Sequence, residues 1–188
     1  MGHKFKFLET DIDGVMVVQR NPFSDPRGKF DNIFNELKNK YIWQDRVVKQ
    51  VNLSTTEKMG AIRGLHIQTS IFQEAKLITC LSGEIYDVSV DLRRGSSTFG
   101  KWFGIKLSSK NNKSIFLPEG IAHGFQNILS SSQVLYCHSN HYSIEHQAGI
   151  NPLDKTLNIN WPIDCSLLSV KDRNLPSFDE FVRMKNEM

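Results

Sequence analysis

The stretch from Gly60 to Gln68, GAIRGLHIQ, carries three polar side chains, Arg63, His66 and Gln68, among apolar residues typical of a buried β-strand. Burying an unpaired charge or an unsatisfied polar group costs on the order of several kcal/mol. These side chains therefore either satisfy one another or line a cavity that holds a polar ligand. Because histidine gains and loses a proton near neutral pH, His66 is a candidate general base or acid in such a cavity.

Gly64 decides whether Arg63 and His66 can share that cavity. Successive side chains of a regular strand alternate between its two faces, which would point Arg63 away from His66. A glycine inside a strand often marks a β-bulge, and a bulge would bring both side chains to one face. Without a bulge, Arg63 would face solvent or an ion pair.

A second motif, PEGIAHGFQN, has the spacing P-x-G-x-x-H-x-x-x-N, formed by Pro118, Gly120, His123 and Asn127. It resembles the second motif of the cupin superfamily of small β-barrels. Metal-binding cupins combine this motif with an earlier H-x-H and a glutamate. Here the earlier place reads H-I-Q at positions 66–68, and Lys76 stands where the glutamate is expected. An ammonium disfavours a bound cation and an amide replaces imidazole poorly, so we predict a metal-free pocket.

The scaffold that positions these residues is predicted to be β-rich. Short apolar or alternating runs recur from about residue 15 to residue 142, separated by turn-forming residues, as in an antiparallel sandwich or barrel. KLITCLSGEIYDVSVDL predicts a hairpin in which residues 77–81 and 84–92 flank Ser82-Gly83. SIFLPEGIAHGFQNIL has the same form, with its turn at 118–120. SQVLYCHSNHYS predicts a strand with Val134, Tyr136 and His138 on one face.

Helical periodicity is confined to residues 31–40 and 177–186. The segment 149–176 reads as a long ordered covering loop, and loops of that length in a compact domain are usually functional. We therefore predict a single domain over residues 1–188. Its core lies at about 15–145, and the covering loop and C-terminal helix lie at about 149–188.

Composition excludes several classes of function. The chain has 23 basic and 20 acidic residues, a net charge of +3 and no long basic run, so we expect no nucleic-acid partner. Its three cysteines show no CxxC spacing, which favours reduced thiols over disulfides or a zinc site. The N-terminus MGHKFKFLET lacks a signal peptide, and no apolar run reaches membrane-spanning length. We expect a soluble, cytoplasmic protein without a membrane partner.

Five motifs in order, RGLHIQ, GEIYDVSVDLRRGSSTFGKW, LPEGIAHGF, LYCHSNHYS and LLSVKD, resemble the dTDP-4-dehydrorhamnose 3,5-epimerase family over about residues 22–172. The resemblance implies a mainly β, double-stranded β-helix (a cupin jelly-roll barrel) with a few short peripheral helices, assembled as a homodimer. It also implies an isomerase that inverts C3, C5 or both of a nucleotide-linked 4-keto-6-deoxyhexose through an enolate. No metal or organic cofactor is expected, and the product would serve deoxysugar biosynthesis for a surface polysaccharide such as lipopolysaccharide.

The resemblance also assigns four catalytic roles. His66 matches the base that removes the proton beside the ketone, and Asp172 matches the carboxylate that orients it. Lys76 matches the positive group beside the enolate oxygen, where a preorganised charge is most effective. Tyr136 matches the acid that returns a proton from the opposite face of the sugar.

The substrate-binding residues follow from the same resemblance. Arg63 and His123 match pocket residues that hold the diphosphate or sugar and support the enolate, and a planar guanidinium suits phosphate oxygens. Tyr142 matches an aromatic that stacks on the base. Further nucleotide contacts, some expected on an N-terminal strand lent by the partner subunit, are Arg27, Gln50, Asn52 and Lys171.

Two positions depart from the family pattern, because Asn32 and Gln147 stand where glutamates are usual. An amide donates as well as accepts, so the exchange could alter which base is read. The family resemblance implies a dTDP-linked substrate. The two amides make a CDP-linked 4-keto-deoxyhexose the alternative. A same-fold 3,4-ketoisomerase, a non-catalytic sugar-nucleotide-binding cupin and a metal-dependent cupin oxygenase are the other hypotheses. The last of these is disfavoured by Gln68 and Lys76.

Overall fold

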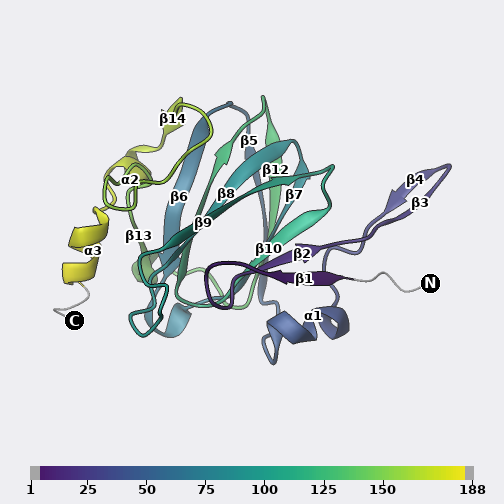
Figure 1. Ribbon diagram of the computed structural model, residues 1–188, viewed down its shortest axis with the longest axis horizontal. Helices are drawn as coiled ribbons and strands as arrows, with labels where there is room; N and C mark the ends of the chain where they lie inside the picture. The colour runs from purple at the N-terminus through teal and green to yellow at the C-terminus, as the bar shows by residue number, and fades with distance from the viewer. Residues whose placement is uncertain (1–4, 185–188) are drawn as a thin grey trace.

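The computed structural model describes residues 5–184, and most of its strands form two sheets packed face to face (Figure 1). The first sheet contains β1 (Lys6–Glu9), β2 (Met16–Gln19), β5 (Gln50–Thr56), β7 (Lys76–Ser82), β10 (Lys113–Leu117) and β12 (Ser132–His138). The second contains β6 (Ala61–Gln68), β8 (Glu84–Asp91), β9 (Trp102–Ser108), β11 (Ile121–Asn127), β13 (Gln147–Gly149) and β14 (Leu167–Leu168). Their orders are β1-β2-β10-β7-β12-β5 and β13-β6-β11-β8-β9, with β14 beside β6. The predicted mainly β fold is confirmed.

Apolar side chains fill the space between the sheets. The central cluster joins Ile78 of β7 and Val134 of β12 to Ile85 of β8 and Phe125 of β11, all of them buried. Two further clusters lie on outer faces, one beneath helix α1 (Glu36–Trp43) and one beneath the C-terminal segment. Because several strands are covered on both faces, they read in the sequence as apolar runs rather than as strict alternation.

The two predicted hairpins are wrong. β7 and β8 flank the turn at Ser82-Gly83 as expected, but β7 pairs with β10 and β12, whereas β8 pairs with β9 and β11. In the same way, β10 belongs to the first sheet and β11 to the second. A tight turn lets the chain cross between two sheets as readily as it lets it fold back. Long-range pairing, which a local turn pattern does not encode, decides between the two outcomes.

The helices lie at the periphery of the sheets. α1 begins at Glu36 rather than at residue 31, because the Asn35 side chain caps it by accepting a hydrogen bond from the Lys38 N–H at 3.1 Å. α3 (Phe178–Met184) falls within the predicted 177–186, whose end lies outside the described residues. No helix in residues 5–184 is long and apolar enough to cross a membrane.

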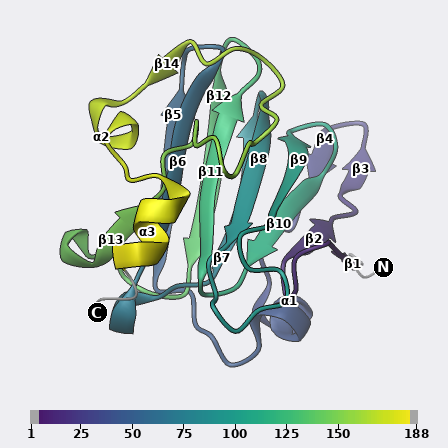
Figure 2. The ribbon, with the colours of Figure 1, turned by 60° about the vertical axis from the view of Figure 1, so that its left-hand side comes forward.

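The segment 149–176, predicted as a covering loop, contains regular structure as well. β14 pairs in parallel with the start of β6, and a short helix, α2 (Val170–Arg173), follows it. Ser169 caps α2 by accepting a hydrogen bond from the Asp172 N–H at 3.0 Å. Figure 2 shows this yellow-green segment lying along β6. The cap and the strand pairing together hold Asp172 beside β6.

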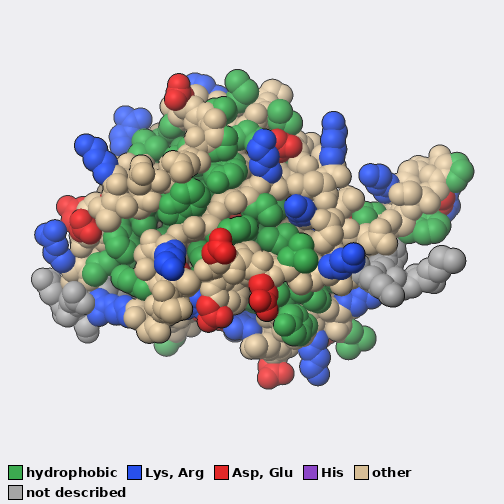
Figure 3. Space-filling model, in the orientation of Figure 1, with side chains coloured by type: hydrophobic (Ala, Val, Ile, Leu, Met, Phe, Trp, Pro, Cys, Tyr) green, Lys and Arg blue, Asp and Glu red, His purple; other side chains and the backbone are tan. Residues whose placement is uncertain are grey.

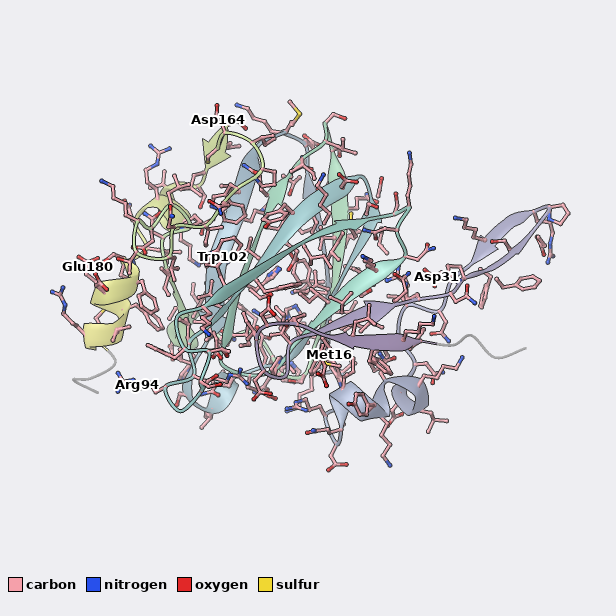
Figure 4. All side chains as sticks on the ribbon, viewed as in Figure 1. Met16, Asp31, Arg94, Trp102, Asp164 and Glu180 are labelled. Carbon is pink, nitrogen blue, oxygen red and sulfur yellow. The ribbon has the colours of Figure 1, made fainter. Side chains whose placement is uncertain are left out.

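A hairpin arm projects from the body of the molecule. Within residues 5–184, β3 (Phe23–Asp25) and β4 (Gly28–Phe30) pair only with each other. Figure 1 and Figure 3 show the arm standing clear of the sheets. Phe23 and Phe30 are 53% and 67% exposed. Figure 4 labels Asp31 near the base of the arm, where Arg20 Nε lies 2.9 Å from its carboxylate.

Candidate active site

A cavity of about 790 Å³ is lined by both sheets and by the segment that carries α2. Strands β6 and β11 contribute one wall, and strands β5, β7 and β12 contribute the other. Most of the predicted site residues line it, namely Asn52, Arg63, His66, Lys76, His123, Tyr136, Tyr142, Gln147, Lys171 and Asp172. The fold therefore gathers side chains that are far apart in the sequence around one space.

The predicted irregularity at Gly64 is present. His66 pairs with His123 across β6 and β11, whereas Arg63 pairs with Phe125, so two residues of β6 face one residue of β11. Gly64 has a φ of 116°, and a Cβ built on it would lie 2.6 Å from the neighbouring backbone of β11. Only glycine fits there. The bulge allows Arg63 and His66 to line the same cavity.

Two residues of β5, in the facing sheet, hold the Arg63 guanidinium. Its Nε donates to Thr56 Oγ1 at 2.9 Å, and its Nη2 donates to the Thr55 carbonyl at 3.1 Å. The side chain is exposed at the rim of the cavity. In this position it can meet the oxygens of a bound phosphate.

His66 and Asp172 form a hydrogen bond, with 2.6 Å between His66 Nε2 and Asp172 Oδ1. An ionised carboxylate only accepts, so Nε2 carries the donated proton and Nδ1 keeps its lone pair. Burial works against the ionisation of Asp172, but the hydrogen bonds from His66 and from the Gly64 N–H hold its pKa below the ordinary value. The His66 side chain is 30% exposed. The pair has the form of a general base supported by a buried carboxylate.

Tyr136 lies between two histidines that each pair with a buried carboxylate. The His123 ring meets it edge-on, and His123 Nε2 lies 2.7 Å from Asp87 Oδ2. The His138 ring stacks on its other side, and His138 Nδ1 lies 2.8 Å from Glu74 Oε2. Burial raises the pKa of Tyr136 well above its ordinary value. The phenol is therefore neutral and able to donate a proton.

Lys76 is buried in the cavity wall with a carboxylate beside it. Its Nζ lies 3.2 Å from Glu74 Oε1, and the two side chains are 9% and 7% exposed. Burial favours the neutral form of Glu74, but the His138 hydrogen bond and the Lys76 charge outweigh it and lower the pKa of Glu74. The carboxylate compensates the buried ammonium, which can still face a developing oxyanion.

A second group of hydrogen bonds surrounds Tyr142, whose side chain is 49% exposed. The Tyr142 hydroxyl donates to Gln147 Oε1 at 2.8 Å, and the same oxygen accepts a hydrogen bond from Lys171 Nζ. The Tyr142 N–H donates to Gln50 Oε1 at 3.0 Å. Gln50 does not itself line the cavity, but its Nε2 donates to Asn52 Oδ1 at 3.1 Å. These hydrogen bonds hold the partly exposed Tyr142 ring at the cavity, where it can meet a flat ligand group.

Arg27 and Asn32 are not brought to this cavity. Arg27 lies in the turn of the arm, where its guanidinium pairs with Asp25 at 2.7 Å. Asn32 follows the arm and is half-buried. Within one chain, the structure therefore leaves the site without two of its predicted nucleotide contacts.

Sequence reasoning missed two residues of the cavity wall, Glu74 and His138, and it missed Asp87, the buried partner of His123. Asp87 was detectable as a charged residue inside the apolar run EIYDVSVDL, and His138 as the neighbour of Tyr136 on one strand face. Gln68 is buried, and its Nε2 donates to the His141 carbonyl at 3.2 Å, so it supports the chain before Tyr142. In residues 5–184, no three His, Cys, Asp or Glu side chains are grouped as a metal site would require.

A family model described as dTDP-4-dehydrorhamnose 3,5-epimerase matches residues 9–180. The chain belongs to the dTDP-4-dehydrorhamnose 3,5-epimerase family. One relative of that name, from Shigella flexneri, is 38% identical over 176 residues, which are 91% of this chain and 94% of its own length. The predicted family resemblance is thereby confirmed.

Solved structures of the epimerase family match the whole architecture. The dTDP-4-dehydrorhamnose 3,5-epimerase of Bacillus anthracis, solved with TDP and PPi bound, is 37% identical with a TM-score of 0.89, and the match covers 93% of this chain and 99% of that one. ChmJ, a 3'-monoepimerase from Streptomyces bikiniensis solved with dTDP-quinovose, is 31% identical with a TM-score of 0.88, covering 94% and 89%. The chain shares the cupin-type β fold of these epimerases.

Proposed function

We propose that this chain is an epimerase that inverts C3, C5 or both of a dTDP-linked 4-keto-6-deoxyhexose through an enolate. The observation that carries this proposal is the placement of the His66–Asp172 pair and the buried Tyr136 on opposing sheets around one cavity. Family membership and the names of the relatives support it. A protein that only bound the sugar nucleotide would not need a matched base and acid.

His66 starts the reaction. Its Nδ1 takes a proton from a carbon next to the C4 ketone, while Nε2–H stays hydrogen-bonded to Asp172. The carboxylate fixes the tautomer of the imidazole and stabilises the imidazolium that forms. One C–H bond breaks, and its electrons move to the ketone oxygen.

The enolate oxygen then needs a positive group that is already in place. Lys76 supplies an ammonium in the buried wall, where Glu74 holds it from one side. Because the Lys76 side chain is only 9% exposed, its charge stabilises a developing oxyanion more strongly than a charge surrounded by water would.

Tyr136 completes the inversion by returning a proton to the opposite face of the same carbon. It projects from β12 of the first sheet, whereas His66 projects from β6 of the second. After one inversion His66 has gained a proton and Tyr136 has lost one. Exchange with solvent resets both groups.

The test of this function is nuclear magnetic resonance of dTDP-4-keto-6-deoxyglucose in deuterated water. Each inverted carbon is expected to carry deuterium in the product, so the spectrum distinguishes inversion at C3, at C5 or at both. If the native protein, which has all of its active-site histidines, catalyses neither deuterium uptake nor inversion, the epimerase function is excluded.

The nucleotide is proposed to be dTDP. The Bacillus anthracis relative binds TDP, and the Streptomyces bikiniensis relative binds dTDP-quinovose. Gln147, one of the two departures from the family pattern, directs its carbonyl at Tyr142 and Lys171. The Gln147 carbonyl is therefore engaged within the protein, and the assignment of dTDP rests on the ligands of the two relatives.

The purified chain is expected to bind dTDP about tenfold more tightly than CDP, a difference of about 1.4 kcal/mol. Isothermal titration calorimetry with the two nucleotides measures it. Equal binding, or tighter binding of CDP, would contradict the assignment of dTDP.

The arm supports a homodimer in which each subunit serves its partner's cavity. An isolated two-stranded hairpin is marginally stable in water, and this one exposes Phe23 and Phe30. Arg27 in its turn does not line the cavity of its own chain. Seated on a second copy, the arm would bury its aromatic rings and bring Arg27 to that copy's nucleotide.

Mixed dimers test this arrangement. His66→Ala and Arg27→Ala homodimers are each expected to lose most activity. In the first, both sites lack His66, and in the second, both sites lack Arg27. If Arg27 acts across the dimer, a heterodimer of the two variants has one intact site, so random association of co-expressed subunits recovers about a quarter of native activity. No recovery, with heterodimers demonstrated by tagged purification, would place Arg27 in its own subunit's site.

We propose a cytoplasmic location and a role in deoxysugar supply for a surface polysaccharide such as lipopolysaccharide. Cys80, Cys137 and Cys165 are all free thiols, as expected for a reducing compartment.

A further inference from the structure

A continuous line of hydrogen bonds joins the sugar end of the cavity to its nucleotide end. It begins at Lys76 and passes in order through Glu74, His138, Asn52 and Gln50 to the N–H of Tyr142. The successive distances between bonded atoms are 3.2, 2.8, 3.3, 3.1 and 3.0 Å. His138 takes no part in the reaction described above, although it stands at the centre of this line.

The ionised carboxylate of Glu74 fixes the direction of every bond beyond it. Because it only accepts, His138 Nδ1 must donate to it, and the Nε2 of a neutral His138 then keeps a lone pair. Asn52 must then turn its Nδ2–H toward that lone pair. Its Oδ1 therefore faces Gln50 Nε2, and Gln50 Oε1 is left to accept the Tyr142 N–H.

The surroundings of Glu74 and His138 set them apart from an exposed ion pair. Their side chains are 7% and 10% exposed. The Tyr136 ring stacks on the His138 imidazole, with the two planes 16° apart, so the imidazole is held between a carboxylate, an amide and an aromatic face. Side chains held this closely keep one orientation, which a solvated pair would not.

We propose that Glu74 and His138 are positioning residues that fix the amide orientations of Asn52 and Gln50 and thereby set the affinity for the nucleotide. This inference rests on the proposed function, because it takes Asn52 and Tyr142, whose N–H donates to Gln50, as nucleotide contacts. The same carboxylate holds Lys76, so a single buried charge organises both ends of the substrate.

Two substitutions of His138 test its hydrogen bonds to Glu74 and to Asn52 separately. In His138→Asn the shorter amide stays near the Nδ1 position, where it can donate to Glu74, but it leaves Asn52 without an acceptor. In His138→Gln the longer side chain brings a carbonyl toward the Nε2 position, where it accepts from Asn52. The Gln variant is thus the matched control for the Asn variant.

Calorimetric titration with dTDP is expected to give a Kd about fivefold higher than native for His138→Asn, the loss of one hydrogen bond, and within about twofold of native for His138→Gln. Native affinity in both variants would overturn the proposal, and so would equal weakening in both. A purely structural role for His138 would not produce the rescue by glutamine.

A second measurement needs neither ligand nor a His138 variant. Nitrogen-15 spectra of the free native protein are expected to show His138 protonated at Nδ1 and bare at Nε2, and Glu74→Gln is expected to lose that preference. A His138 protonated at Nε2 in the native protein would overturn the proposal. Failure of the native protein to bind dTDP would instead contradict the proposed nucleotide, and the tautomer would still test the positioning role.

Discussion

Replacing His66 by alanine is expected to slow deuterium exchange at C3 and C5 of dTDP-4-keto-6-deoxyglucose by about 10²- to 10⁴-fold. The His66 imidazole has a free lone pair at Nδ1 and a buried carboxylate, Asp172, behind it. Its side chain is 30% exposed, whereas those of His123 and His138 are 6% and 10% exposed. Removal of the imidazole leaves the enolate-stabilising Lys76 in place but no base to form the enolate. Proton resonance spectra recorded over time in deuterated water measure the exchange at each carbon separately.

Asp172→Asn is expected to have a milder effect on deuterium exchange than His66→Ala. The amide has nearly the same size as the carboxylate but does not carry the charge that stabilises the His66 imidazolium. Its exchange rate is expected to fall between those of the native protein and of His66→Ala. Native exchange in His66→Ala would show that another group is the base, provided that thermal unfolding shows the variant to be folded.

Replacing Tyr136 by phenylalanine is expected to separate two events that occur together in the native protein. The base at His66 remains, so deuterium should still enter C3 and C5, whereas inversion should fall by about 10²-fold or more because the acid on the opposite face is missing. The substitution removes only the hydroxyl group, and the ring can still lie between His123 and His138.

The same spectra provide both readings, since exchange removes the proton signal of a carbon, whereas inversion moves the signals of the remaining ring protons. Tyr41→Phe is a suitable control, because this tyrosine lies on α1, is 68% exposed and is remote from the cavity. If Tyr136→Phe loses exchange and inversion to the same extent, Tyr136 is also needed for proton removal. Its role would then extend beyond returning a proton on the sugar face opposite to His66.

The parts of the site that follow from short-range pattern could be predicted from the sequence. The bulge at Gly64 follows from strand parity, because Arg63 and His66 share a face only if one residue is inserted. The strand face of Tyr136 follows from alternation along β12. The meeting of His66 with Asp172 came from family resemblance alone, since no local rule connects residues so far apart in the chain.

The parts that depend on long-range pairing could not be predicted. Turn chemistry at Ser82-Gly83 suggested a hairpin, yet the strands on either side find their partners in different sheets. Asp87 and Glu74 gain their importance from histidines on other strands, His123 and His138. Their pairing depends on the register of those strands, which sequence spacing alone does not give.

The splitting of neighbouring strands between two sheets has a kinetic consequence. Met16 pairs with Phe116, and Gln50 pairs with His138, so the chain must close large loops before those contacts stabilise it. A fold of such high contact order is built slowly, and little of it is stable in isolation. The cavity draws its walls from these distant pairings. Affinity for the nucleotide sugar therefore emerges together with the complete fold, and a nascent or partly folded chain has no working pocket.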